Sequence, residues 1–232
     1  GDGTLGSVLD FPCGSSPRGL ELGDLNGDAH LDVVTANGFP DNCSVLLGNG
    51  DGTFAPRTDY AEADAPIAVT LADFNADGRL DLAVVNEQYP CVVSVRLGQG
   101  GGAFGPRMER SLGGPAMSAY WVATGDFNRD GRPDLVAPAF DSVAVLLGNG
   151  DGTFGPTTEF PAGGLGTRVV VADLNADGFE DLAISTLRRM YDAAKQAELP
   201  IGRFGQAHEV APTALLLASS PGGDLYTGQT LG

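Results

Sequence analysis

The sequence predicts an all-β protein, a β-propeller of four four-stranded blades, and three observations point to that class. Glycine accounts for 35 of 232 residues, which favours short strands joined by tight turns. An acidic nine-residue segment recurs four times at intervals of about fifty residues. A glycine-rich segment, Leu-Gly-Asn-Gly-Asp-Gly-Thr-Phe, recurs between its copies. A repeat of this period, with strand patterns throughout, is typical of propeller blades.

Apolar patterning within each repeat predicts four strands. The first precedes the acidic segment, as in 67–71 and 169–171. The second follows it directly, over 31–35, 80–85, 135–137 and 182–185. The third covers 45–47, 92–97 and 143–147 and ends in Asn-Gly-Asp-Gly, which predicts a tight hairpin with positive φ at both central residues. The fourth covers 54–60, 104–112 and 154–160.

These strands predict one domain over residues 1–232. We expect blades at about 18–60, 66–112, 118–160 and 168–232, with an insertion at 187–212 whose start has helical spacing. The fourth blade lacks a clear outer strand, so we expect residues 5–12 to complete it and close the ring, because an unpaired strand edge is a liability. The alternatives are a fragment of a larger ring and two chains sharing an eight-bladed ring.

Composition excludes some partners. The chain carries 13 basic and 30 acidic residues, for a formal net charge of −17. Such a surface repels phosphate backbones and acidic membrane leaflets, so we expect no nucleic-acid partner. No apolar stretch is long enough to span a bilayer, so we expect no membrane insertion.

The acidic segments have the form D-x-N-x-D-x-x-x-D and predict calcium sites, up to four per chain. Side-chain oxygens at positions 1, 3, 5 and 9, with the backbone carbonyl at position 7, form the hard donor set that Ca²⁺ prefers. The expected ligands are Asp24, Asn26, Asp28, His30 and Asp32; Asp73, Asn75, Asp77, Arg79 and Asp81; Asp126, Asn128, Asp130, Arg132 and Asp134; and Asp173, Asn175, Asp177, Phe179 and Asp181.

Two further points concern these loops. The helix–loop–helix calcium motif is excluded, because position 12 is never Glu. The alternative is that Asp-Asn-Asp-Gly only makes turns. We expect the first site to be the weakest, because Ala29 replaces the glycine at position 6, and we expect the His30 imidazole to point to solvent.

The opposite face is where a ligand is expected. Strands alternate in direction, so the acidic loops and hairpins share one face, and the variable loops and the insertion share the other, where recognition usually lies. Candidate ligand-binding residues there are Tyr89, Tyr120, Trp121, Phe140, Arg188, Tyr191 and His208. The alternative for Tyr120 and Trp121 is packing between blades. Of the three cysteines, Cys13 and Cys43 are expected to form a disulfide.

The four acidic loops, with Phe104-Gly105-Pro106 and Phe154-Gly155-Pro156, resemble the FG-GAP/VCBS repeats of integrin α-chain propellers and of many secreted proteins. The resemblance implies a propeller with calcium loops on one face and ligands on the other. Family members are usually seven-bladed. They include adhesins, lectins and domains attached to enzymes, so the resemblance leaves the function open.

The sequence is therefore compatible with three functions. The first is a secreted or cell-surface binding module, an adhesin or lectin for a carbohydrate or protein, in which calcium is structural. The second is a structural or assembly protein, with homo-oligomers possible. The third is a polysaccharide lyase or hydrolase, for which the sequence offers no convincing catalytic set, so no enzymatic activity is expected. Loops of this ligand class fill at extracellular calcium levels, which favours the outside of the cell.

Overall fold

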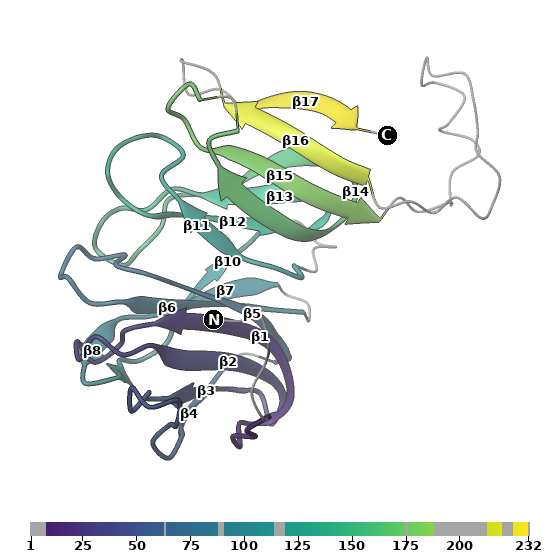
Figure 1. Cartoon of the computed structure of the whole chain (residues 1–232). Helices are drawn as coiled ribbons and strands as arrows, with labels where there is room; N and C mark the ends of the chain where they lie inside the picture. The colour runs from purple at the N-terminus through teal and green to yellow at the C-terminus, as the bar shows by residue number, and fades with distance from the viewer. Residues whose placement is uncertain are drawn as a thin grey trace, which may run out of the picture.

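The computed structural model describes residues 8–62, 64–87, 91–113, 119–174, 176–187, 213–219 and 225–231. Within these ranges seventeen strands, paired antiparallel, form an all-β structure (Figure 1). No helix occurs in these ranges, and so none that could cross a bilayer. The predicted helical start of the insertion lies outside the described residues.

Two separate four-stranded sheets form the first half of the chain. Unit 1 contains β1 (Ser15–Gly23), β2 (Asp32–Phe39), β3 (Asn42–Leu46) and β4 (Thr58–Ala61), in that spatial order. Unit 2 contains β5 (Pro66–Ala72), β6 (Asp81–Asn86), β7 (Val92–Arg96) and β10 (Met108–Ser111). Its hairpin is extended by the short ribbon of β8 (Gly98–Gly100) and β9 (Ala103–Phe104).

The second half forms one seven-stranded sheet. Its strands are β11 (Ala123–Gly125), β12 (Asp134–Pro138), β13 (Phe140–Leu146), β14 (Thr158–Ala172), β15 (Asp181–Leu187), β16 (Thr213–Ser219) and β17 (Leu225–Leu231). The beginning of β14 pairs with β13 and its end pairs with β15, so one strand is both the last of unit 3 and the first of unit 4.

The predicted strand pattern is largely confirmed. The last aspartate of each acidic loop begins the second strand of its unit, at Asp32, Asp81, Asp134 and Asp181. The fourth strands begin later than expected, at residues 58, 108 and 158. Proline stands two positions earlier in each copy and supplies no N–H to a ladder.

The predicted tight hairpins are wider than expected. In unit 1 the connection runs from Asn49 to Thr53, between the bridged residues Gly48 and Phe54. Positive φ falls on Gly50 (78°) and Gly52 (87°) and not on two adjacent residues. The Asn49 N–H donates to the Thr53 carbonyl at 2.9 Å, and the Asp51 carboxylate accepts the Thr53 N–H at 2.9 Å and its hydroxyl at 2.6 Å, so side-chain bonds add to the backbone bond that closes the turn.

The hydrophobic core lies between consecutive units. There are three buried clusters, and each contains residues of two consecutive units. They lie between units 1 and 2, between units 2 and 3, and between units 3 and 4. The hairpins join these interfaces: the Gly102 N–H donates to the Leu25 carbonyl at 3.1 Å, and the Gly152 N–H to the Phe74 carbonyl at 3.0 Å. A Cβ on Gly102 would lie 2.5 Å from Leu47 Cδ2, so this close approach requires glycine.

The described strands form no closed ring. Unit 1 and unit 4 lie at opposite ends of the array (Figure 1), and the outer-strand place of unit 4 is taken by β17. The expected closing strand at 5–12 is therefore wrong for residues 8–12, which form no strand. Phe11 instead packs edge-to-face on Phe54 of unit 1, with ring centroids 4.9 Å apart.

The two end units expose apolar side chains whose counterparts are buried. Leu174 is 51% exposed, whereas Leu25, Phe74 and Phe127 at the same repeat position are 7%, 2% and 8% exposed. Likewise Leu20 in β1 is 57% exposed, and its counterparts in the next three units are at most 4% exposed. Each interior position is covered by a neighbouring unit that the end units lack.

This difference predicts unequal costs for one substitution at two equivalent positions. Leu25→Ala should lower the free energy of unfolding by about 2–4 kcal/mol, because it leaves a cavity between units 1 and 2. Leu174→Ala should cost less than about 1 kcal/mol, because the side chain is already half in water. Urea unfolding of both variants checks this, and equal losses would show that Leu174 is covered in solution.

Candidate metal-binding loops

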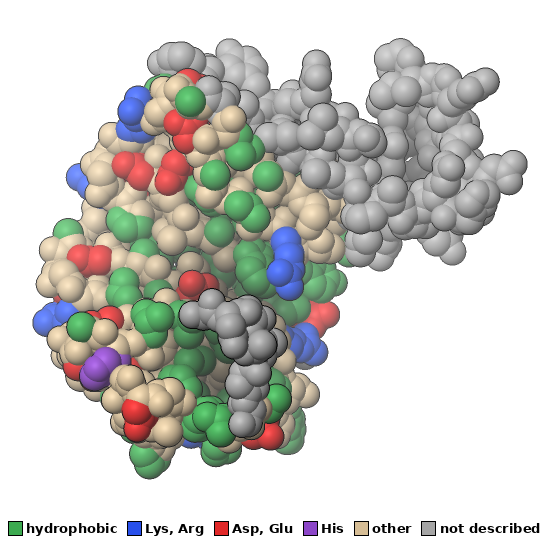
Figure 2. All heavy atoms as spheres, in the orientation of Figure 1, with side chains coloured by type: hydrophobic (Ala, Val, Ile, Leu, Met, Phe, Trp, Pro, Cys, Tyr) green, Lys and Arg blue, Asp and Glu red, His purple; other side chains and the backbone are tan. Residues whose placement is uncertain are grey.

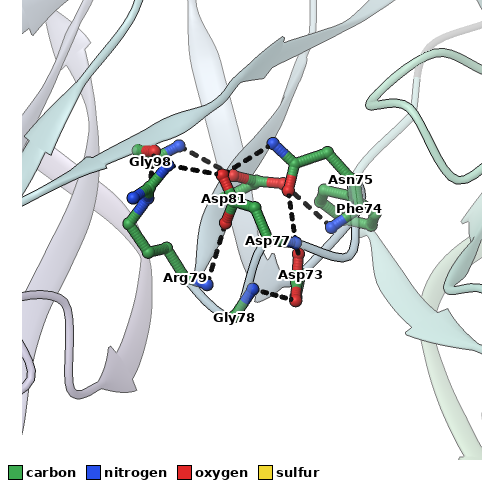
Figure 3. A network of polar contacts seen from close by, with 8 residues as sticks. All are labelled: Asp73, Phe74, Asn75, Asp77, Gly78, Arg79, Asp81 and Gly98. Carbon is green, nitrogen blue, oxygen red and sulfur yellow. Dashed lines mark hydrogen bonds and ion pairs between the residues drawn. The ribbon is translucent and has the colours of Figure 1, made fainter.

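The carboxylate at position 9 fastens each acidic loop to its own unit. Asp81 is fully buried, and its two oxygens accept the Phe74 N–H at 2.9 Å and the Gly98 N–H at 2.7 Å (Figure 3). Asp32 and Asp134 make the same pair of bonds, to Leu25 and Gly48 and to Phe127 and Gly148. This one side chain thus joins the start of the loop to the start of the hairpin.

The carboxylates at positions 1 and 5 fold the loop on itself. Asp73 accepts the N–H groups of Asp77 at 3.0 Å and Gly78 at 2.7 Å, and Asp77 accepts that of Arg79 at 3.0 Å (Figure 3). The Asn75 amide donates to Asp77 at 3.0 Å. The bonds at positions 1 and 5 recur in the other three loops. All four loops therefore share these hydrogen bonds, the fourth over its described residues 173–174 and 176–181.

Backbone strain does not single out the first loop. Positions 4 and 6 are left-handed in every copy, and each copy has one glycine and one other residue there. The first loop has Gly27 and Ala29 (φ 67°), and the second has Ala76 (φ 57°) and Gly78. Because a non-glycine left-handed residue costs about 1–2 kcal/mol, the cost is similar in all loops. The reason for expecting the first site to be weakest is thereby removed.

Side chains at position 7 reach the neighbouring hairpin. Arg79 Nε donates to the Gly98 carbonyl at 3.0 Å, and its Nη2 lies 2.7 Å from an Asp77 oxygen. The His30 side chain is 46% exposed, which agrees with the expectation that it points to solvent, but its ring also lies over the hairpin, because a Cβ on Gly50 would lie 2.4 Å from His30 Nε2. The ring fills the space that glycine leaves, while Nδ1 lies 3.3 Å from Asp28 Oδ1.

The loops contain unbalanced negative charge. Burial, together with the charges of Asp130 and Asp126, raises the pKa of Asp134 to about 6. Burial raises the pKa of Asp81 in the same way. Glu180 of unit 4 adds a further carboxylate to the third loop, where it accepts the Asp126 N–H at 2.6 Å. At positions 1 and 5 of the first loop, backbone N–H donors instead lower the pKa of Asp24 and Asp28, so a cation would mainly offset the cost of the buried carboxylate at position 9.

The donor set fits calcium in its chemistry. Each loop offers three carboxylates, an amide and a backbone carbonyl within nine residues, all of them hard oxygen donors. Carboxylate oxygens have two lone pairs each, so the position-9 side chain can hold its N–H groups and a cation together. Among the residues that the structure describes, no three acidic, histidine or cysteine side chains are grouped closely enough to hold a metal ion, so the fit rests on the donor types and their spacing in the loop and not on their present positions.

Comparison with known proteins identifies the repeat. A family model described as an FG-GAP-like repeat matches residues 24–84, 73–137 and 136–184, which together cover more than half of the chain. The chain belongs to the FG-GAP-like repeat family. This confirms the resemblance carried by the acidic loops, and the three matched stretches begin at or run through them. No curated protein matches the sequence significantly.

Several solved structures resemble the FG-GAP-like chain over part of their length. An Agrocybe aegerita lectin that recognises non-reducing terminal N-acetylglucosamine is 24% identical with a TM-score of 0.48, over 71% of this chain and 47% of the lectin. The V. cholerae biofilm matrix protein Bap1 is 17% identical with a TM-score of 0.47, over 87% and 26%. The chain thus spans less than half of either protein.

The predicted ligand residues are not brought together by the described part of the FG-GAP-like chain. Trp121 packs against the clusters on both sides of unit 3, and the Arg168 guanidinium lies over its ring at 4.6 Å, so packing between units accounts for it. Tyr120 is partly exposed beside it, and Phe140 begins β13. Tyr89, Arg188, Tyr191 and His208 lie outside the described residues.

The expected Cys13–Cys43 disulfide is absent, because all three cysteines are free. The Gly14 N–H donates to the Ser44 hydroxyl at 3.1 Å, which places the segment containing Cys13 on the Ser44 side of β3. Successive side chains of a strand point to opposite faces, so Cys43 points away, into the cluster between units 1 and 2. Burial raises the pKa of the Cys43 thiol well above its usual value.

Proposed function

We propose that this protein is a calcium-stabilised binding module of the propeller type, in which the units are blades and each acidic loop holds one Ca²⁺. The observation that carries the proposal is the fourfold recurrence of one loop conformation built from hard oxygen donors. Positions 1, 3, 5 and 9 would supply side-chain oxygens, and position 7 its carbonyl, as in Asp73, Asn75, Asp77, Asp81 and Arg79.

The bound ion would supply positive charge at the turn between the first two strands of each unit. The protein's own residues do the rest: position 9 fixes the loop to the hairpin, and the position-7 side chain packs on the hairpin glycine. Because the hairpins of units 2 and 3 in turn bond to the preceding unit, an ordered loop there stabilises the interface between units. Calcium of this kind is structural, and it favours action outside the cell, where calcium is abundant.

The binding role is assigned to the rim opposite the acidic loops. Loops carry recognition more often than the strands that position them, and the loops of this rim vary from unit to unit. Phe39 lies there at the end of β2 and is 67% exposed. An exposed aromatic ring on a rigid strand end suits a carbohydrate or a protein surface.

Glycan and protein arrays probed with the whole chain in calcium test this role. We expect selective binding that is lost in EGTA, and Phe39→Ala should weaken it by about tenfold. Leu147→Ala is the matched control. Leu147 is a 41% exposed apolar residue of unit 3 on the rim of the acidic loops, away from the proposed binding rim. Binding that is abolished equally by both variants, or no selective binding at all, would contradict the assignment.

A further inference from the structure

An aromatic ring recurs at the outer edge of the interfaces between units. It belongs to the outer-strand residue that pairs with Cys43 in unit 1 and with Val143 in unit 3, namely Tyr60 and Phe160. The Tyr60 ring meets Phe104 of the next unit edge-to-face at 5.6 Å, and its hydroxyl accepts the Phe104 N–H at 3.1 Å. Phe160 packs against the cluster between units 3 and 4.

The N-terminal segment repeats the same contact on the free side of unit 1. Phe11 meets Phe54 edge-to-face, with the rings at 81°. The sequence places Phe11 at the same distance from its Gly-Asp-Gly-Thr segment as Tyr60 from its own. Two hairpin-side positions, Phe54 and Phe104, are therefore each covered by an aromatic ring from the preceding stretch of chain.

The interface between units 2 and 3 breaks this pattern. The residue paired with Val93 is Arg110, an exposed side chain whose Nη2 donates to the Gly155 carbonyl at 3.0 Å. A cavity of about 220 Å³ lies beside it. Its apolar lining comes from Val95, Met108 and Phe154, and Glu109, Arg110 and Thr153 also border it. Units 1 and 3 fill this place with a ring of their own.

We propose that this cavity is a binding site for an aromatic ring of the phenol class. Its volume exceeds the roughly 150 Å³ in which an engineered protein cavity holds benzene. Phe154 borders the cavity as Phe104 borders Tyr60, although its ring already meets Phe74 edge-to-face at 5.4 Å, and the Phe154 N–H corresponds to the one that donates to the Tyr60 hydroxyl. Arg110 adds a cation that an aromatic face attracts. The site is independent of calcium and of the rim opposite the loops.

Methyl NMR of the whole chain, with labelled methionine, tests the site using 4-methylphenol as the probe. Met108 lines the cavity, so its methyl signal should move upfield by ring current and saturate with a Kd on the order of 1 mM. The signals of the other two methionines, Met117 and Met190, are recorded in the same spectra. A Met108 signal that does not move at a probe concentration of about ten times the expected Kd would overturn the proposal.

Two variants at one position separate cavity filling from loss of charge. Arg110→Tyr places a ring of the protein itself in the cavity, so we expect the Met108 titration to disappear and the melting temperature to rise by roughly 2–4 °C. Arg110→Ala leaves the cavity open and should keep the titration. If Arg110→Tyr still titrated as the wild type does, or if Arg110→Ala alone abolished binding, the ring-filling account would be wrong.

A variant at a different interface tests the same idea if Arg110→Tyr does not fold. Tyr60→Arg should open a matching cavity at the interface between units 1 and 2, and 4-methylphenol should then bind two sites instead of one.

A second probe, N-acetyltyrosinamide, distinguishes the two possible sources of the natural ring. Tighter binding than 4-methylphenol assigns the site to a tyrosine side chain of a partner, and weaker binding assigns it to free phenols.

Discussion

Removing calcium should lower the free energy of unfolding by several kcal/mol. An ion present at a hundred times its Kd stabilises the folded state by about 2.7 kcal/mol per site, provided that it does not bind the unfolded chain. Two occupied loops would therefore contribute about 5 kcal/mol, and four would contribute more. Differential scanning calorimetry in millimolar calcium and in excess EGTA measures this, and adding calcium back should restore the melting temperature.

Charge screening must be separated from site binding in that experiment. The chain has a formal net charge of −17, so any salt reduces its self-repulsion. Magnesium at the same concentration is the control, because it screens equally but prefers a smaller octahedral site. Identical melting curves in calcium, in magnesium and in EGTA would contradict the calcium proposal.

Asp81→Ala should be costly even without calcium. The side chain is fully buried and holds the N–H groups of Phe74 and Gly98, both of which would lose their partner. Each buried group left without a hydrogen bond costs about 1–3 kcal/mol, so we expect a loss of about 2–6 kcal/mol in EGTA. Urea unfolding monitored by tryptophan fluorescence measures it, since the chain has one tryptophan, Trp121.

Asp77→Ala is the matched control from the same loop. Its carboxylate is partly exposed and bonds only to groups within the loop that water can also satisfy. In EGTA this variant should lose less than about 1 kcal/mol, and in calcium it should lose the stabilisation contributed by the second site. Equal losses for Asp81→Ala and Asp77→Ala in EGTA would show that position 9 has no fastening role of its own.

The sequence predicted the strands and the loops well, because both leave local signals. Four aspartates at one repeat position begin the second strands, as the apolar run after each of them indicates. The left-handed backbone at position 4 was missed, because Ala76 and Arg129 occupy it and only glycine signals that conformation from sequence. The fastening role of Asp81 was missed too, since its second partner, Gly98, comes seventeen residues later.

Features that depend on the packing of units could not be predicted. Ring closure by residues 5–12 was inferred from an apparent gap in the fourth unit, but β17 fills that place. The ion pair of Glu62 and Arg96, at 2.6 Å between units 1 and 2, joins residues far apart in the chain that share no motif. Likewise the sequence suggested a pairing of Cys13 with Cys43. The segment containing Cys13 lies on one side of β3, and the Cys43 side chain points to the other side.

The number of calcium ions bound per chain tests the central claim most directly. Equilibrium dialysis at millimolar free calcium, followed by metal analysis, should find four ions per wild-type chain. A chain carrying both Asn75→Ala and Asp77→Ala should bind one fewer, with the remaining loops unchanged. Fewer than one ion per wild-type chain, or the same number in the double variant, would contradict the assignment of the acidic loops as calcium sites.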